Sequence, residues 1–147
     1  MDTISENRRA RFDYEISETY EAGIELQGHE VKGAKLGRMQ LAGSHAIIRG
    51  GEIYLINSQI PQYQPGNTPK DYDAGRTRRL LLKKVEISGL LGSLKQKSVS
   101  LIPLRAYVKN GFIKIELGLA RAKKKHDKRE ALKKKSTERE MRNSTKR

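Results

Sequence analysis

Apolar and polar residues alternate along most of the first 120 positions, a period of two that is typical of strands with one buried face. The alternation starts with Phe12, Tyr14 and Ile16. It predicts strands at residues 12–19, 39–49, 53–60, 80–85, 99–108 and 112–119. The sequence also predicts two hairpins. Gly50–Gly51 and Asn110–Gly111 each separate two neighbouring predicted strands, and these residues suit tight turns that need positive φ.

Two segments have the period of a helix. Residues 21–35 fit both patterns, because Ala22, Ile24 and Leu26 alternate while later apolar positions up to Ala34 recur at helical spacing. We interpret this segment as a helix. A second stripe, with spacing i, i+3, i+4 and i+7, consists of Ile87, Leu90, Leu91 and Leu94.

Residues 61–79 contain a high density of chain breakers, which predicts a long exposed loop. These are Pro61, Pro65, Gly66, Pro69 and Gly75. Long loops within compact domains are usually functional. The short strands with one or two short helices predict a mainly β fold. We expect a small closed OB-like antiparallel barrel, because closure removes exposed sheet edges.

The chain is strongly basic, with 31 Lys and Arg against 17 Asp and Glu and a net charge of +14. Such an excess attracts polyanions and makes nucleic acid the leading partner, although a solvated basic surface is the alternative. Residues 121–147 hold 13 basic and 4 acidic residues, a net charge of +9, against +5 for residues 1–120. The charge distribution therefore separates a barrel, residues 1–120, from a basic C-terminal tail, residues 121–147.

The tail has too few apolar residues to bury a core of its own. After Ala122 only Ala131, Leu132 and Met141 are apolar. Acid precedes base at i, i+4 in two places, Glu130 with Lys134 and Glu138 with Arg142, which favours a helix. We expect the tail to be disordered in isolation and to fold into a helix on its partner.

Composition excludes several kinds of chemistry. The chain has no cysteine, so disulfides and thiolate zinc sites are absent and a reducing cytoplasm fits. His29, His45 and His126 lack metal-ligand spacing, and no nucleotide loop or nucleophile elbow occurs, so we expect no metal, no cofactor and no enzymatic activity. No apolar run is long enough for a signal peptide or a membrane span.

Two basic clusters are candidate phosphate contacts. Arg76, Arg78 and Arg79 end the long loop just before a predicted strand, and a guanidinium there can meet a phosphate from a rigid scaffold. A second cluster consists of Lys32, Lys35 and Arg38. Either cluster could instead be an ordinary solvated face. Tyr63 and Tyr72 of the loop could stack on unpaired bases or simply anchor the loop.

Six motifs in order resemble small protein B, the SsrA-binding protein family. They are Asn-Arg-Arg-Ala-Arg (7–11), Tyr-Glu-Ala-Gly-Ile (20–24), Gly-His-Glu-Val-Lys (28–32), Arg-Thr-Arg-Arg-Leu-Leu-Leu (76–82), Lys-Asn-Gly (109–111) and Ala-Arg-Ala-Lys-Lys-Lys-His-Asp-Lys-Arg (120–129). Phe12, His45, Ala74 and Ala122 depart from the family pattern, usually histidine, tyrosine, proline and glycine. The departures at Phe12 and Ala122 affect the individual contacts expected at those two positions and leave the expected function unchanged.

The resemblance implies an OB-type barrel that binds the tRNA-like domain of tmRNA and delivers tmRNA to stalled ribosomes for trans-translation. It places Glu21, Leu81 and Lys83 on the RNA-facing surface, with Glu21 accepting hydrogen bonds from a base or a ribose 2′-hydroxyl group. Lys83 replaces the family's histidine or asparagine. One copy is expected per tmRNA, with indirect links through tmRNA to elongation factor Tu and alanyl-tRNA synthetase.

The resemblance also implies that the tail enters the empty mRNA channel of the small ribosomal subunit and contacts its rRNA. Its working residues would be Lys123, Lys124, His126, Asp127, Lys128 and Arg129. Asp127 could cap the induced helix. A ribosomal protein or initiation-factor-like OB module would share the basic barrel but not the motif series. An RNA-modifying enzyme would need reactive groups that are not evident.

Overall fold

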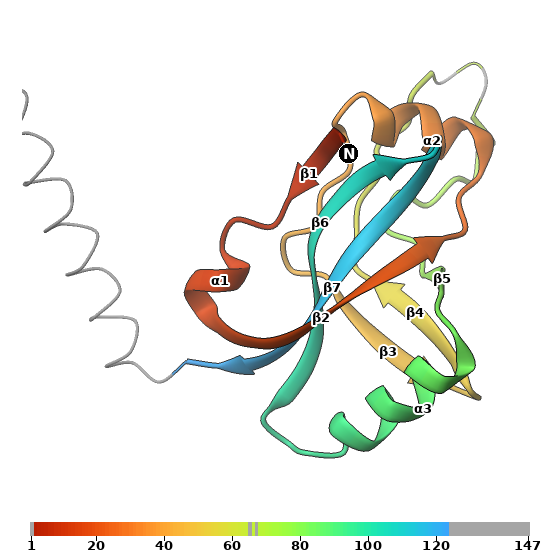
Figure 1. The fold of residues 1–147 in the computed structure, drawn as a ribbon. Helices are drawn as coiled ribbons and strands as arrows, with labels where there is room; N and C mark the ends of the chain where they lie inside the picture. Colours follow the sequence, from red (N-terminus) through yellow and green to blue (C-terminus); the bar gives the residue numbers. More distant parts are fainter. Residues whose placement is uncertain (1, 65, 67, 124–147) are drawn as a thin grey trace, which may run out of the picture.

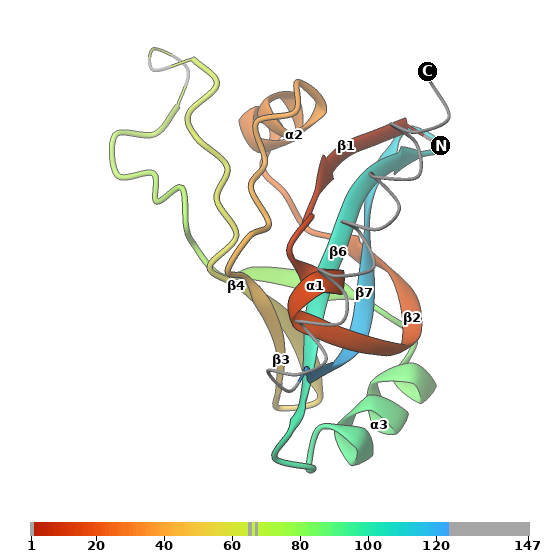
Figure 2. The same ribbon diagram turned by 90° about the vertical axis from the view of Figure 1, so that its left-hand side faces the viewer.

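The computed structural model describes residues 2–64, 66 and 68–123, and Figures 1 and 2 show its ribbon in two views. Antiparallel strands dominate these residues. In chain order the elements are β1 (Asp2–Glu6), α1 (Ala10–Asp13), β2 (Tyr14–Ile24), α2 (Gly28–Lys35), β3 (His45–Arg49), β4 (Glu52–Ile56), β5 (Arg78–Leu81), α3 (Lys84–Ser93), β6 (Val99–Lys109) and β7 (Phe112–Ala122).

The strands form one sheet that closes on itself. Their order is β1-β6-β3-β4-β5-β2-β7, and β6 also pairs with β7. This last pairing closes a circuit through β2, β7, β6, β3, β4 and β5, while β1 adds to β6 beside the circuit. Strands within such a circuit have no free edge. The predicted mainly β, antiparallel architecture is confirmed.

Alternate residues of the strands fill the barrel. Leu55, Leu80, Leu101 and Leu117 are all at most 1% exposed and belong to the main core cluster. The two longer helices lie at opposite ends of the barrel (Figure 1), and each contributes buried side chains to that core. A smaller cluster lies under α1 and consists of Ala10, Ile102, Leu104 and Ala120.

The boundary between the first strand and the first long helix differs from the sequence prediction. The strand expected at residues 12–19 begins only at Tyr14, and Phe12 lies in α1. The helix expected at residues 21–35 was wrong at its start, because β2 continues to Ile24. Pairing explains the difference: β2 pairs with β7 as far as Gly23, and strand pairing overrides the ambiguous local period.

The second half of that segment is a helix, α2, as predicted. The backbone N–H of Gln27 donates to the side chain of Glu30 (2.8 Å), which satisfies one donor at the helix start. The helix predicted around residues 87–94 is confirmed as α3. The strand predicted at residues 80–85 is instead Arg78–Leu81, because the chain turns into α3 directly afterwards.

Both predicted hairpins are confirmed, β3 with β4 and β6 with β7. In the second turn Asn110 and Gly111 have φ of 52° and 81°, the positive values that a type I′ turn requires. Strand β3 is shorter than predicted and covers only His45–Arg49. Strand β1 was not predicted from the sequence.

Candidate nucleic-acid interface

Three residues that the sequence assigned to RNA lie together on the outer face of the barrel: Glu21, Leu81 and Lys83. Gly23 of β2 pairs with Leu81 of β5 and with Lys114 of β7, which joins three strands at this point. A Cβ atom on Gly23 would lie 3.3 Å from the Cβ atom of Leu81, so the close approach of β2 and β5 favours glycine. All five residues line a shallow hollow of about 340 Å³.

The side chains around this hollow differ in chemistry. Leu81 is 46% exposed and adds apolar surface to the hollow. Lys83 is exposed just before α3, where its backbone N–H donates to Glu86 (3.4 Å). Lys83 and Lys114 can meet phosphates, while Leu81 can pack against a base or a ribose. We call the surface formed by Glu21, Gly23, Leu81, Lys83 and Lys114 the Glu21 surface.

The Glu21 carboxylate is held from the neighbouring part of β6. The Tyr107 hydroxyl donates a short hydrogen bond to Oε2, and Lys109 Nζ lies 3.2 Å from Oε1. The hydrogen bond from Tyr107, together with those and the charges from Lys109 and Lys114, lowers the pKa of Glu21 below its ordinary value. Glu21 is therefore ionised at neutral pH and acts as an acceptor.

The predicted cluster of Lys32, Lys35 and Arg38 is exposed around the end of α2. Cations at a helix C-terminus also complement the helix dipole. The Arg38 guanidinium lies 5.7 Å from the centre of the Tyr63 ring and donates to the Tyr63 carbonyl (3.4 Å). Tyr63 belongs to the segment between β4 and β5, so this segment lies against the basic surface at the end of α2.

The three arginines of the other predicted cluster occupy three different environments. Arg78 is fully buried, because it points into the barrel from β5. Arg79 points outward, 42% exposed, and pairs with Glu52 (2.8 Å) and Glu25 (3.4 Å). The side chain of Arg76 is 29% exposed. Contrary to the surface position that the sequence suggested, the Arg78 guanidinium does not face solvent.

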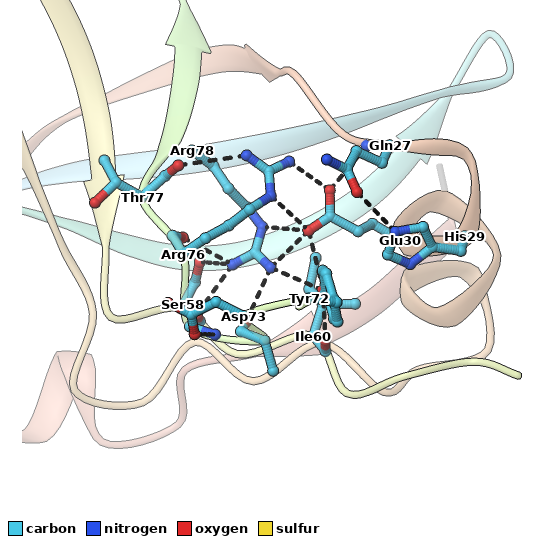
Figure 3. A network of polar contacts seen from close by, with 12 residues as sticks. Gln27, His29, Glu30, Ser58, Ile60, Tyr72, Asp73, Arg76, Thr77 and Arg78 are labelled. Atoms are coloured by element: carbon cyan, nitrogen blue, oxygen red, sulfur yellow. Dashed lines mark hydrogen bonds and ion pairs between the residues drawn. The ribbon is translucent and has the colours of Figure 1, made fainter. Parts of the chain in front are cut away.

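Arg76 and Arg78 both pair with Glu30, which is itself fully buried in α2 (Figure 3). Arg78 Nη2 lies 2.7 Å from Glu30 Oε2, and Arg76 makes a short contact to Oε1. The Tyr72 hydroxyl oxygen lies 3.0 Å from Glu30 Oε2 and 2.7 Å from the Ile60 carbonyl oxygen, so either oxygen can accept its one proton. This network fastens the long segment before β5 onto α2.

The electrostatics of Glu30 follow from these contacts. Burial raises its pKa, but the hydrogen bonds from Arg76, the Gln27 backbone N–H and Arg78 outweigh burial and lower the pKa to about 2. Arg78 also donates to the Ser58 carbonyl (3.0 Å) and the Ala74 carbonyl (2.9 Å), so its buried donors are satisfied. We call Glu30, Tyr72, Arg76 and Arg78 the Glu30 network.

Strand β7 includes residues 121 and 122 of the predicted tail, and the next residue, Lys123, lies beside the N-terminal motif. The Lys123 backbone N–H donates to the Asp13 carbonyl, and Lys123 Nζ donates to the Arg11 carbonyl, both at 2.9 Å. Asn7 is held by β6, since its side chain donates to the Pro103 carbonyl (3.0 Å). The motif at residues 7–11 and the beginning of the tail therefore share one surface. The predicted tail residues Lys124, His126, Asp127, Lys128 and Arg129 lie outside the described residues.

Metal ligands are not grouped in the described part of the chain, where no three His, Asp or Glu side chains could hold an ion. Among these residues no helix has the length and apolar character needed to cross a membrane.

Sequence reasoning missed two features of the site. Tyr107 was not singled out, although its place two residues from both Arg105 and Lys109 puts the three on one face of a strand. Glu30 was read only as part of a family motif. An acid within a segment otherwise rich in small and apolar residues was the available signal for burial with a cation.

Comparison with known proteins agrees with the motif series. A profile of the family described as SmpB protein matches residues 4–147. The SsrA-binding protein of Gloeothece citriformis is 49% identical over 144 residues, which cover 98% of this chain and 93% of that protein. The SsrA-binding protein of Geobacillus thermodenitrificans is 49% identical over 138 residues, which cover 94% and 88%.

A solved structure is also similar. One chain of the structure described as "tmRNA-SmpB: a journey to the center of the bacterial ribosome" has a TM-score of 0.68 and 47% sequence identity. The match covers 86% of this chain and 92% of that one. Because the family profile spans nearly the whole sequence and the relatives align over nearly their full lengths, this chain belongs to the SmpB family of SsrA-binding proteins.

Proposed function

We propose that this protein is a non-enzymatic RNA-binding protein of trans-translation. Its barrel binds the tRNA-like domain of tmRNA and delivers tmRNA to stalled ribosomes, which are then rescued while the unfinished peptide is tagged. The observation that carries this proposal is the likeness, at 47% identity, to a chain of a tmRNA–SmpB ribosome structure. The net charge of +14 supports a polyanionic partner.

The Glu21 surface supports the binding of structured RNA. Leu81 offers apolar contact, Lys83 and Lys114 offer charge, and the Glu21 carboxylate accepts hydrogen bonds from donors that a phosphate group does not have. Three acids, Glu21, Glu52 and Glu86, line the hollow together with Arg79, Lys83 and Lys114. An acid repels phosphate, so this mixed lining favours a specific contact over general charge attraction. The basic surface at the end of α2 adds phosphate contacts, and Arg79 lines the hollow of the Glu21 surface itself.

The tail from Lys123 onward acts at the ribosome in this proposal. It enters the empty mRNA channel of the small subunit and folds there against rRNA, so an intact message would exclude it. One protein molecule serves each tmRNA in the cytoplasm, and tmRNA provides the indirect links to elongation factor Tu and alanyl-tRNA synthetase. The contacts of Lys123 with Arg11 and Asp13 support a tail that starts from a fixed point on the barrel.

Ribosome fractionation tests the proposal. The protein should sediment with stalled ribosomes when tmRNA is present and should be strongly depleted from them when tmRNA is deleted. A constitutive ribosomal protein would remain with the ribosomes in both cases, and that outcome would refute the proposal.

A truncation after Lys123 separates the two parts. It retains every element from β1 to β7, so tmRNA affinity should stay near the full-length value, reduced only by the lost charge of the tail. Peptide tagging on stalled ribosomes should fall to background. Tagging at the full rate by the truncated protein would show that the tail is not needed.

A further inference from the structure

Tyr107 is buried by neighbouring side chains on the outer face of the barrel and not by packing into the hydrophobic core. It is 2% exposed, yet it belongs to neither core cluster, because it projects from the outer face of β6 opposite Lys114 of β7. The Arg105 guanidinium covers its ring at 4.4 Å from the ring centre. Arg105 is itself held by Glu116 at 3.6 Å and by Thr3 at 3.2 Å. The ring is thus fixed from one side by a cation.

The Tyr107 hydroxyl points at the Glu21 surface. It donates to Glu21 Oε2, while Lys109, two residues further along β6, contacts both oxygens at 3.2 and 3.3 Å. An ionised carboxylate offers about four acceptor positions. The side chain of Glu21 is 40% exposed, so acceptor capacity remains toward solvent.

We propose that Tyr107 is a positioning residue for RNA recognition: its hydroxyl fixes the Glu21 carboxylate so that the exposed acceptor positions meet a hydrogen-bond donor of the bound RNA. This inference rests on the proposed function of the Glu21 surface. A glutamate otherwise loses rotamer freedom on binding, and a preformed orientation reduces that cost. Tyr107 does this without touching the RNA, because its ring is covered and its hydroxyl is occupied.

A double-mutant cycle on tmRNA affinity tests the coupling, with tmRNA transcribed in vitro as the probe. Tyr107→Phe keeps the ring and removes the hydroxyl, and Glu21→Ala removes the carboxylate. We expect Tyr107→Phe to weaken binding about fivefold in the presence of Glu21, and to have almost no effect in the Glu21→Ala background, since contacting residues couple.

Salt dependence distinguishes positioning from charge. Tyr107→Phe changes no charge, so the slope of log affinity against log salt should be unchanged although the affinity falls. Lys109→Met removes a cation from the same carboxylate and should also couple to Glu21→Ala. Tyr107→Phe and Lys109→Met each remove a different contact to the Glu21 carboxylate. The coupling to Glu21 can therefore still be measured if one of the two variants does not fold.

Tyr20→Phe is the matched control. Tyr20 lies on β2 next to Glu21 in sequence, and its hydroxyl donates to Glu18 at 2.5 Å. This is the same kind of tyrosine–carboxylate contact, but it does not involve the Glu21 carboxylate, and Tyr20 does not line the hollow. It should leave tmRNA affinity unchanged, and melting curves should show all variants folded at the assay temperature.

The outcomes separate this inference from the proposed function. Additive losses for Tyr107→Phe and Glu21→Ala, or no loss for Tyr107→Phe while Glu21→Ala weakens binding, would overturn the positioning role and leave tmRNA binding in place. An unchanged affinity for Glu21→Ala would overturn both the positioning role and the assignment of Glu21 to the interface. Absence of any tmRNA binding by the wild-type protein would overturn the proposed function itself.

Discussion

Two glutamates nine positions apart, Glu21 and Glu30, are each held by a tyrosine and by basic side chains, but in opposite environments. Glu30 is fully buried and meets Tyr72, Arg76 and Arg78. Glu21 is half-exposed and meets Tyr107 and Lys109. Similar groups therefore stabilise the fold around Glu30 and form a hydrogen-bond acceptor site on the surface at Glu21. Burial, more than residue type, separates the two roles.

The physical reason lies in desolvation. A charge inside the barrel must be matched by partners that replace its lost water, and two arginines supply that match for Glu30. A charge on the surface remains hydrated, so its contacts orient it without being essential for folding. Variants of Glu30 and its partners should therefore affect folding, and variants of Glu21 and its partners should affect RNA binding.

The largest effect is expected from Arg78→Met. It removes one partner of the buried pair and leaves Glu30 incompletely compensated, which typically costs roughly 3–5 kcal/mol of unfolding free energy. Arg79→Met is the control, since Arg79 is the next residue of β5 but points outward to Glu52 and Glu25. Urea unfolding should show a large loss for the first and little change for the second. Equal losses would mean that burial does not explain the role of Arg78.

The second-largest effect is expected in the acid dependence of stability, to which the Glu30 network contributes. The folded-state pKa of Glu30 is about 2, below its ordinary value of 4.5, so its ionised form stabilises the fold above pH 4.5 and this contribution is lost as the pH falls toward 2. Glu30→Gln should be less stable at neutral pH and should lose less stability than wild type between pH 4.5 and 2. Unfolding midpoints at several pH values measure this slope, and parallel curves would contradict the assignment.

A smaller effect is expected from Lys83→Met on the Glu21 surface. If Lys83 neutralises one phosphate, the slope of log affinity against log salt should fall by about 0.7 to 0.9. Lys97→Met, an exposed lysine between α3 and β6, removes the same charge away from the hollow and should leave the slope nearly unchanged. Equal changes from both lysines would indicate general charge attraction in place of a defined contact.

The smallest change in stability is expected from Glu21→Gln. Because the side chain is solvated, urea unfolding should be close to wild type, while tmRNA affinity should fall as the acceptor charge is lost. Thus Glu30 variants should alter folding and Glu21 variants should alter binding. A strong destabilisation by Glu21→Gln would remove the distinction between the two glutamates.

The fold was predictable where its signals are local. The Asn110–Gly111 turn and the alternating strands beside it were located correctly, because turn geometry and a period of two depend only on neighbouring residues. Strand β1 was missed, because its few residues become a strand only by pairing with β6. The strand–helix boundary after Glu21 was wrong because its local pattern fits both structures and pairing with β7 decides between them.

The candidate site was predictable only in part. Glu21, Leu81 and Lys83 were proposed from family motifs, and the structure brings them to one surface. The three arginines at residues 76–79 were proposed as one cluster, but successive residues of a strand face opposite sides, so Arg78 and Arg79 separate. The side of the strand that faces the core is set by distant partners.

The sequence by itself determined the basic charge, the mainly β character, the hairpin turns and membership of the SmpB family, since composition, local periodicity and ordered motifs carry this information. Only the tertiary structure decided which charged groups are buried and which are offered to a partner. Glu30 meets Arg78 across 48 positions and Glu21 meets Tyr107 across 86. Such pairs depend on the register of strands around a closed barrel, and no local pattern encodes which residues will face each other there.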